Sequence, residues 1–311
     1  MSAIIPVSPS LPTTSQLPDF SALLSGAVSP STAEVYRGDA RAYTAWAKAQ
    51  GLDPLHPATF GAWRSHLVTA TDYSPRTINR MLSAVRKLVD EAATQGIIPE
   101  AVAASFARIG GVKVSAMVSR TKRNARVRIS PSQMRAIIEA PDTATLKGLR
   151  DRAFLLLLAT SGLRVSEAIS LTVDDLTERP DGQGVTVLGK NRSERHFAPM
   201  SREAWNAIWA WLKARPVHSA YVFTSAQGRG GRWIDKPMSK VAAWKMVRGY
   251  AAQVGVKDIK PHDFRRFVGT QLVERHGVAT AQAVLGHKNA ATTLDNYVIS
   301  DVRGNVTEGL F

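Results

Sequence analysis

Residues 159–168 read Ala-Thr-Ser-Gly-Leu-Arg-Val-Ser-Glu-Ala and connect two predicted helices. Gly162 suits the tight turn between these helices, so the spacing places Arg164 at that turn. Glu167 follows three residues later and therefore shares a helical face with Arg164. Taken alone, such a pair is more often a structural ion pair than part of a reaction centre. Its meaning therefore depends on the other polar residues of the chain.

Further residues with reactive or phosphate-binding chemistry follow this turn. They are Lys190 at the tip of a predicted hairpin, His262 and Arg265 one helical turn apart, His287 directly after a helix that ends at Gly286, and Tyr297. Each has an ordinary explanation by itself, because a hairpin lysine is usually solvated and a histidine after a helix is more often a core or capping residue. The order of the whole set is far more specific than any one member.

Two other kinds of site are weaker interpretations. Residues 184–190 have the glycine and lysine spacing of a phosphate-binding loop, but Asn191 stands where that loop needs Ser or Thr, and the segment alternates like a strand. A zinc site made of histidines alone stays an alternative, although the chain has no His-Glu-x-x-His helix. The absence of cysteine excludes a disulfide scaffold, a thiolate metal site and a cysteine nucleophile.

The charge of the chain favours a polyanionic partner. The 311 residues carry 40 Lys and Arg against 25 Asp and Glu, a formal net charge of +15. Residues 1–110 hold 9 basic and 8 acidic side chains (+1), whereas residues 111–311 hold 31 and 17 (+14). Nucleic acid is the simplest such partner, and a solvated basic surface without a partner is the alternative.

The apolar segments are too short for a membrane span. The longest run, 153–159, is flanked by charged residues, and residues 1–30 lack the pattern of a secretory signal. We therefore expect a soluble cytoplasmic protein, associated with the nucleoid if its partner is DNA, that contacts no membrane.

The length is that of about two domains, and we expect the chain to be mainly α-helical. Residues 1–30 are rich in Ser, Pro and Thr and predict a flexible leader. Residues 31–112 predict a helical domain. Its helices run from a capping box at Ser31 to Gly51, over about 57–69, from Ser74-Pro75 to Gly96, and near 99–108.

Residues 113–128 predict a basic linker, because the segment contains six basic side chains and no acid. Its basic residues are Lys113, Arg120, Lys122, Arg123, Arg126 and Arg128. If the partner is DNA, we expect Arg120, Lys122, Arg123, Arg126 and Arg128 to contact it. Residues 129–311 predict a second, mostly helical domain with a small antiparallel sheet. We expect strands over 184–189 and 194–199, and helices near 131–140, 146–160, 165–170, 201–213, 239–254, 262–276, 279–285 and 291–299.

The helix that begins at Ser74-Pro75 is amphipathic when its residues are spaced by about 100°. Its apolar residues gather on one side; they are Ile78, Met81, Leu82, Val85, Leu88 and Val89. Arg76, Arg80 and Lys87 gather on the opposite side. By itself this basic stripe is an ordinary solvated face, but in a polyanion-binding protein it would contact phosphates.

The chain resembles the tyrosine recombinases, also called the phage integrase family. Residues 159–168 are similar almost residue for residue to the first arginine box of the family. Gly189-Lys190 resembles its hairpin lysine, and His262-Asp263-Phe264-Arg265 with Leu285-Gly286-His287 resembles its second box. Residues 31–108 resemble the helical core-binding domain. The short leader favours a simple two-domain layout like that of Cre or Xer recombinases.

This resemblance implies a site-specific DNA recombinase that needs no metal, cofactor or ATP. Tyr297 would attack the scissile phosphate and form a 3′-phosphotyrosine, and Arg164 and Arg265 would bind the non-bridging oxygens. Lys190 would protonate the leaving oxygen and His262 would help to accept the tyrosine proton. His287 would stabilise the same charge, and Glu167 would orient its neighbours. The implied partners are double-stranded DNA carrying a specific site and three further copies in a homotetramer.

The sequence departs from the family pattern at three positions. Tyr297 lies ten residues after His287, where the family usually has nine, and Ile299 replaces a histidine that often follows the tyrosine. Arg266 stands where many members have histidine. Two other functions therefore stay open, namely a type IB topoisomerase with the same phosphotyrosine chemistry and a non-cleaving DNA-binding protein.

Overall fold

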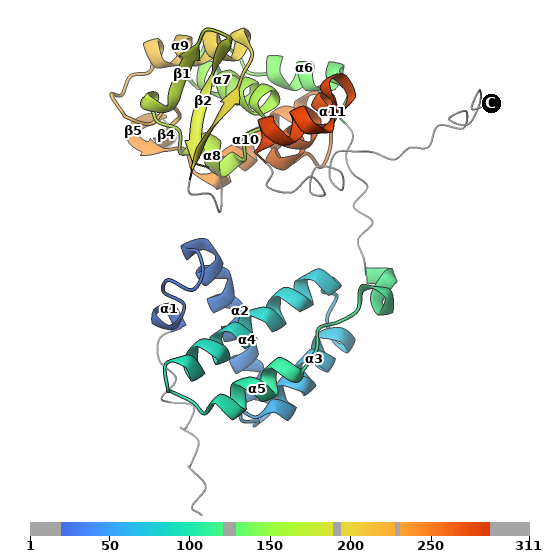
Figure 1. Ribbon diagram of the computed structural model, residues 1–311. Helices are drawn as coiled ribbons and strands as arrows, with labels where there is room; N and C mark the ends of the chain where they lie inside the picture. Colours follow the sequence, from blue (N-terminus) through green and yellow to red (C-terminus); the bar gives the residue numbers. More distant parts are fainter. Residues whose placement is uncertain (1–19, 121–128, 189–193, 228–230, 287–311) are drawn as a thin grey trace, which may run out of the picture. The chain divides into compact units, whose positions relative to one another are not determined.

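The computed structural model describes residues 20–120, 129–188, 194–227 and 231–286. The chain divides into two compact units, Met1–Asn124 and Ala125–Phe311, and each is described by itself (Figure 1). The first unit is helical, and the second combines helices with small antiparallel sheets, which confirms the predicted mainly α fold. None of the helices in these ranges has the length and hydropathy needed to span a bilayer.

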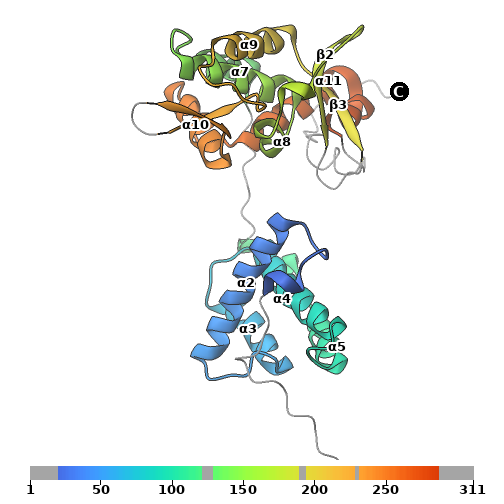
Figure 2. The same cartoon turned by 90° about the vertical axis from the view of Figure 1, so that its left-hand side faces the viewer.

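The amino-terminal unit is built around one amphipathic helix, α4 (Pro75–Thr94). The six apolar residues predicted to share its inner face are all buried. This face packs against α1, α2, α3 and α5 (Figure 2). The other helices of this unit are α1 (Phe20–Leu23), α2 (Pro30–Ala49), α3 (Pro57–Thr69), α5 (Glu100–Arg108) and the 3₁₀ segment η2 (Val114–Arg120).

Local signals set several ends of these helices where the sequence predicts them. Ser74 accepts a hydrogen bond from the Thr77 backbone N–H, and Pro75 occupies the first helical position, where no N–H is needed. Gly51 and Gly96 follow α2 and α4 with φ values of 67° and 71°, a region that glycine adopts without steric cost.

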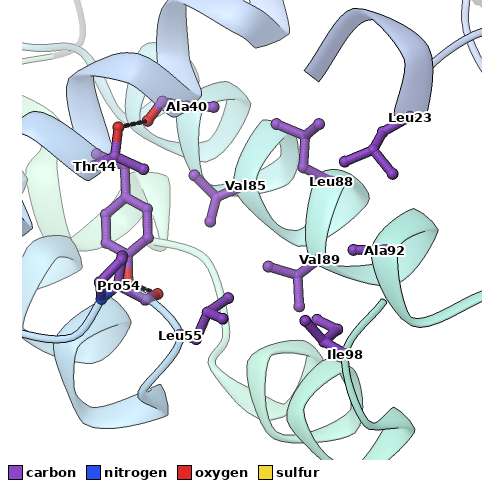
Figure 3. Close-up of a pocket in the computed structure, with 11 residues that line it drawn as sticks. Leu23, Ala40, Thr44, Pro54, Leu55, Val85, Leu88, Val89, Ala92 and Ile98 are labelled. Atoms are coloured by element: carbon purple, nitrogen blue, oxygen red, sulfur yellow. Dashed lines mark hydrogen bonds between the residues drawn. The ribbon is translucent and has the colours of Figure 1, made fainter. Parts of the chain in front are cut away.

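The predicted flexible leader is wrong at its carboxyl-terminal end. Residues 20–23 form α1, and Leu23 and Leu24 are 2% and 1% exposed in the core. Figure 3 shows Leu23 beside Leu88 of α4, at a small apolar cavity of about 40 Å³. The predicted start of α2 is also wrong, because Ser29 and not Ser31 caps this helix. Two adjacent leucines bury enough apolar surface to order this segment.

The predicted linker is likewise folded in its first part. The Asn79 side chain donates to the Val112 carbonyl (2.9 Å) and accepts from the Val112 N–H (2.7 Å), which returns the chain to α4. Met117 of η2 is buried in the core, and Arg120 donates to the Thr71 carbonyl at 2.6 Å. Arg120 is therefore used inside this unit. Lys122, Arg123, Arg126 and Arg128 lie outside the described residues.

The carboxyl-terminal unit is organised around α7 (Leu146–Ser161), which packs against α9 and α11. Its residues 153–158 are all buried. The remaining helices are α6 (Pro131–Glu139), α8 (Val165–Ile169), the 3₁₀ turn η3 (Val173–Asp175), α9 (Arg202–Ala214), α10 (Lys240–Gln253) and α11 (Pro261–Leu285). Helix α11 is interrupted at Gly277 (φ 81°), where the sequence predicts the boundary between two helices.

The strands form two antiparallel sheets. One has the order β1 (Leu176–Arg179), β2 (Gly182–Leu188), β3 (Arg195–Pro199), and the other pairs β4 (Thr224–Gln227) with β5 (Arg232–Pro237). The sequence predicts only β2 and β3, because β1, β4 and β5 are short and mostly exposed. The strand conformation of β2 also rules out a phosphate-binding loop over the described residues 184–188.

Replacement of Leu24 by Ala tests the corrected role of the leader. The substitution removes a fully buried side chain, so we expect the free energy of unfolding to fall by about 2–5 kcal/mol. Val35→Ala is the matched control, because Val35 is 44% exposed. Urea unfolding followed by circular dichroism measures the stability of both variants. Equal stability of Leu24→Ala and the native protein would instead support the original prediction of a flexible leader.

Candidate active site

Arg164 is held at the start of α8 by Glu167. The Arg164 backbone N–H donates to Glu167 Oε2 at 2.8 Å, and its Nη1 donates to Oε1 at 2.8 Å. The Glu167 side chain is 7% exposed, whereas that of Arg164 is 32% exposed. The buried carboxylate therefore fixes the guanidinium from behind, and the open side of Arg164 can still bind an anion.

Arg265 joins two segments that are distant in sequence. It lies on the first turns of α11, is 2% exposed, and donates from Nη1 to the Gly162 carbonyl (2.7 Å) and from Nη2 to the Leu285 carbonyl (2.6 Å). Gly162 precedes Arg164 by two residues, and Leu285 precedes His287 by two. One guanidinium therefore brings both sequence boxes to the same place.

Gly162 permits this close approach. Its φ is 64°, and a Cβ built on it would lie 2.6 Å from Leu285 Cδ2 and 3.1 Å from Val268 Cγ1. A side chain at this position would therefore push α7 and α11 apart. This contact explains why glycine precedes the Arg164 turn.

His262 lies one helical turn before Arg265, as predicted, and its side chain is exposed. The pKa of its imidazole is lowered from 6.5, and the largest cause is that protein atoms replace solvent on one side of the ring. The positive charges of Arg266, Arg265 and Arg164 lower this pKa further, whereas the negative charge of Asp263 raises it. The influence of Arg164 and Arg265 on one ring shows that the three side chains lie within electrostatic range of one another.

Asp263 and Arg266 support the start of α11. Asp263 Oδ2 accepts from the Lys260 N–H at 2.9 Å, and Oδ1 accepts from Arg266 Nη1 at 3.1 Å. Among the residues that the structure describes, the acids of this site, Asp263 and Glu167, are thus occupied by backbone and arginine donors. This described part of the site consequently presents positive charge, which attracts an anion.

The remaining predicted catalytic residues, Lys190, His287 and Tyr297, lie outside the described residues. Their neighbours in sequence are described. Strands β2 and β3 pair up to Leu188 opposite Arg195. Gly286 ends α11 with φ 63°, and a Cβ there would lie 3.0 Å from His196 Nε2. In the described ranges, no group of three or more His, Asp or Glu is arranged to hold a metal ion.

The predicted basic stripe of α4 is largely neutralised. Arg80 donates to Asp39 Oδ2 at 2.6 Å, and Lys87 pairs with Glu91 at 2.7 Å. Asp39 is 6% exposed, so Arg80 compensates a buried charge. Arg76 is exposed on the same helix.

Two further groups of cations were not predicted from the sequence. Arg86 of α4 lies near Arg64 of α3: its pKa is lowered, first by partial burial and then by the charge of Arg64. Two like charges held together by neighbouring helices are a feature of polyanion-binding surfaces. The contact between α3 and α4 creates this pair, so no local sequence signal could have revealed it.

The second missed group lies on the exposed face of α10. Val241 and Trp244 are 62% and 41% exposed, and the Arg248 guanidinium lies 4.5 Å from the centre of the Trp244 ring. Lys240 and Lys245 are exposed on the same helix. The spacing of Trp244 and Arg248 by four residues was a usable signal for this face.

Comparison with known proteins places this geometry in a family. Residues 127–303 match the phage integrase family, and residues 20–96 match the N-terminal SAM-like domain of phage integrases. The tyrosine recombinase XerD of Corynebacterium glutamicum is 30% identical over 283 residues, and XerD of Xanthomonas axonopodis pv. citri is 31% identical over 281 residues. Each alignment covers 86% of both chains.

A solved structure has the same fold. The Tn1549 transposon integrase, in complex with circular intermediate DNA, superposes with a TM-score of 0.62 at 19% identity, covering 91% of this chain and 96% of that chain. The catalytic match includes the Arg164 turn and both boxes joined by Arg265. From its sequence and its fold, this protein belongs to the phage integrase family of tyrosine recombinases.

Proposed function

We propose that this protein is a site-specific recombinase that cuts and rejoins DNA strands through a covalent 3′-phosphotyrosine, without metal or ATP. The observation that carries the proposal is the convergence of Arg164, His262 and Arg265 beside Glu167 and Asp263, two acids that already have arginine and backbone partners. The relatives named XerD tyrosine recombinase and the DNA-bound Tn1549 integrase support DNA as the substrate.

The geometry fits phosphoryl transfer. Attack by the Tyr297 oxygen forms a bond to phosphorus, while the bond from phosphorus to the 5′ oxygen breaks. The tyrosine proton passes to His262, and a proton from Lys190 neutralises the departing 5′ oxygen. Arg164 and Arg265 stabilise the negative charge on the non-bridging oxygens, a task that metal ions perform in other phosphoryl-transfer enzymes.

The covalent bond retains the energy of the broken strand, so resealing by the 5′ hydroxyl needs no ATP. His287 adds a second hydrogen-bond donor to the phosphate, and Glu167 keeps Arg164 oriented. We propose that the helical unit acts as the core-binding domain and the second unit as the catalytic domain. Exchange of strands between two duplexes requires paired sites, which we assign to a homotetramer.

Two basic surfaces are the proposed contacts to the DNA backbone and grooves. In the helical unit, Arg64 and Arg86 are the best candidates for phosphate contacts. In the catalytic unit, the exposed face of α10 combines cations with apolar side chains, the combination that reads base edges and thymine methyl groups in a major groove. We retain Arg76 as a phosphate contact and assign Arg80 and Lys87 mainly to internal ion pairs.

Replacement of Tyr297 by Phe tests the covalent step. With a nicked suicide duplex carrying the recombination site, the native protein should form an adduct that survives denaturing gel electrophoresis. Tyr297→Phe should form none, because the nucleophilic oxygen is absent. An adduct with the Phe variant would show that another residue is the nucleophile.

The same assay separates the alternative functions. A recombinase should form the adduct only on duplexes containing its site, whereas a type IB topoisomerase should form it on unrelated sequences as well. A protein that binds DNA without cleaving it should shift the duplex in a native gel and form no adduct on any sequence.

The lowered pKa of His262 predicts a particular pH profile. The neutral imidazole is the form that accepts the tyrosine proton, so adduct formation should decrease in acid with an inflection below pH 6.5. Arg266→Ala removes a positive charge and frees Asp263. Both changes favour the protonated ring, so the inflection should move upward toward 6.5. Arg275→Ala, with an exposed cation further along α11, is the control; an unmoved inflection in Arg266→Ala would contradict the role of His262.

The salt dependence of DNA binding tests the revised basic surface. Arg64→Ala and Arg86→Ala should each lower the slope of log affinity against log salt concentration by about one, because each loses one phosphate contact. Arg80→Ala should leave that slope unchanged but destabilise the protein by about 1–3 kcal/mol, because the buried Asp39 carboxylate loses its partner. Fluorescence anisotropy with a labelled duplex and urea unfolding measure the two effects. A lower slope for Arg80→Ala, with unchanged slopes for Arg64→Ala and Arg86→Ala, would show that Arg80 contacts the phosphates instead.

A further inference from the structure

The base of the β2–β3 hairpin is tied to the segment that follows α8. Arg195, the first residue of β3, donates from Nη2 to Asp175 Oδ1 and to the Thr186 carbonyl of β2. Arg195 is also the partner of Leu188 in the last described strand pair of β2 and β3. Arg195 therefore lies where β3 begins, directly after the stretch of sequence that contains Lys190.

Asp175 is a rigid anchor for this arginine. Its Oδ2 accepts from the Thr172 N–H at 2.9 Å and from Thr172 Oγ1 at 3.0 Å, and its side chain is 14% exposed. The Val173 N–H donates to the Ala220 carbonyl at 2.8 Å, which fixes the same turn from the other side. Both Asp175 oxygens thus have donors, and the carboxylate has little freedom to move.

The anchor lies beside the Arg164 turn. A recess of about 300 Å³ is lined by Glu167 of α8, by Thr172 and Asp175 of the anchor, and by Leu188 and Arg195 of the hairpin base. Glu167 also binds Arg164. The base of the hairpin is therefore held against residues 167–175, the same short stretch of chain that contains Glu167, the partner of Arg164.

We propose that the Arg195–Asp175 ion pair is the positioning device for Lys190: it fixes the ends of β2 and β3 on either side of the lysine in sequence, and hence where the lysine can deliver its proton. The proposal rests on the proposed function, in which Lys190 protonates the leaving 5′ oxygen. Lys190 is two residues beyond Leu188 and five before Arg195, so this strand pair bounds the positions that the lysine can reach.

An ion pair that served stability alone would have a small effect here. The Arg195 side chain is 53% exposed, and exposed pairs contribute little to stability, whereas proton delivery depends on the placement of the acid within hydrogen-bond reach. Loss of Arg195 should therefore leave the fold intact and impair one step of the reaction, namely departure of the 5′ oxygen.

A sulfur-substituted substrate isolates that step. We compare a suicide duplex with an ordinary scissile phosphate and the same duplex with sulfur in place of the bridging 5′ oxygen, at the cut site mapped with the native protein. A thiolate leaves without being protonated, so a defect in proton delivery is rescued by sulfur. A defect in phosphate binding or in Tyr297 is not.

We expect Arg195→Ala to slow adduct formation on the oxygen substrate by about ten-fold or more, and to be within about three-fold of the native rate on the sulfur substrate. Lys190→Ala should show the same rescue with a larger defect. Asp175→Asn should resemble Arg195→Ala, and the double variant should be no slower than the worse single variant, because both remove one interaction.

Arg232→Ala is the matched control. Arg232 is the first residue of β5 and pairs with Gln227, the last residue of β4. The substitution therefore removes the same charge at a position equivalent to that of Arg195. Its rates should be unchanged on both substrates. Thermal unfolding of Arg195→Ala should remain close to that of the native protein.

The possible failures are distinguishable. Equal slowing of Arg195→Ala on both substrates, or native rates on the oxygen substrate, would overturn the positioning role. A Lys190→Ala variant that sulfur does not rescue would overturn it too, because the lysine would not be the acid. A native protein that forms no adduct with either duplex would instead contradict the proposed function itself.

Discussion

The buried guanidinium of Arg265 is the interaction on which the catalytic unit depends. A permanent charge that is 2% exposed needs hydrogen-bond partners, and the carbonyls of Gly162 and Leu285 supply them. In meeting that requirement, Arg265 fixes the end of α7 against the end of α11. Arg265 therefore adds two hydrogen bonds to the packing of α7 against α11, and so helps to fix the chain before Arg164 relative to the chain before His287.

The electrostatics around that side chain suit an anionic ligand. Glu167 and Asp263 are nearly buried, and each is occupied by a backbone N–H and an arginine. Their negative charges thus orient the cations. The pKa of His262 is lowered first by partial burial of its ring and then by the positive charges of the neighbouring arginines, which resist a further proton.

Charge counted along the sequence proved a poor guide to which cations are available. Arg80 and Lys87 share a helical face with Arg76, but Asp39 and Glu91 neutralise them. The predicted leader and linker failed for a related reason. Leu24 lies in the predicted leader and Met117 in the predicted basic linker, and each is buried in a core built by other helices. Composition averages over a segment, whereas one or two apolar side chains can order it.

The sequence by itself determined where most helices begin and end, because Ser-Pro caps and terminal glycines act within a few residues of each boundary. It also determined the order and chemical nature of the site residues, and so the family. Tertiary structure decided which charged side chains have partners inside the protein and which remain available to a ligand. The pairs that settle this, such as Arg80 with Asp39 and Arg265 with Gly162, lie 41 and 103 residues apart. Contacts over such separations depend on how the helices pack, and local sequence signals do not record that packing.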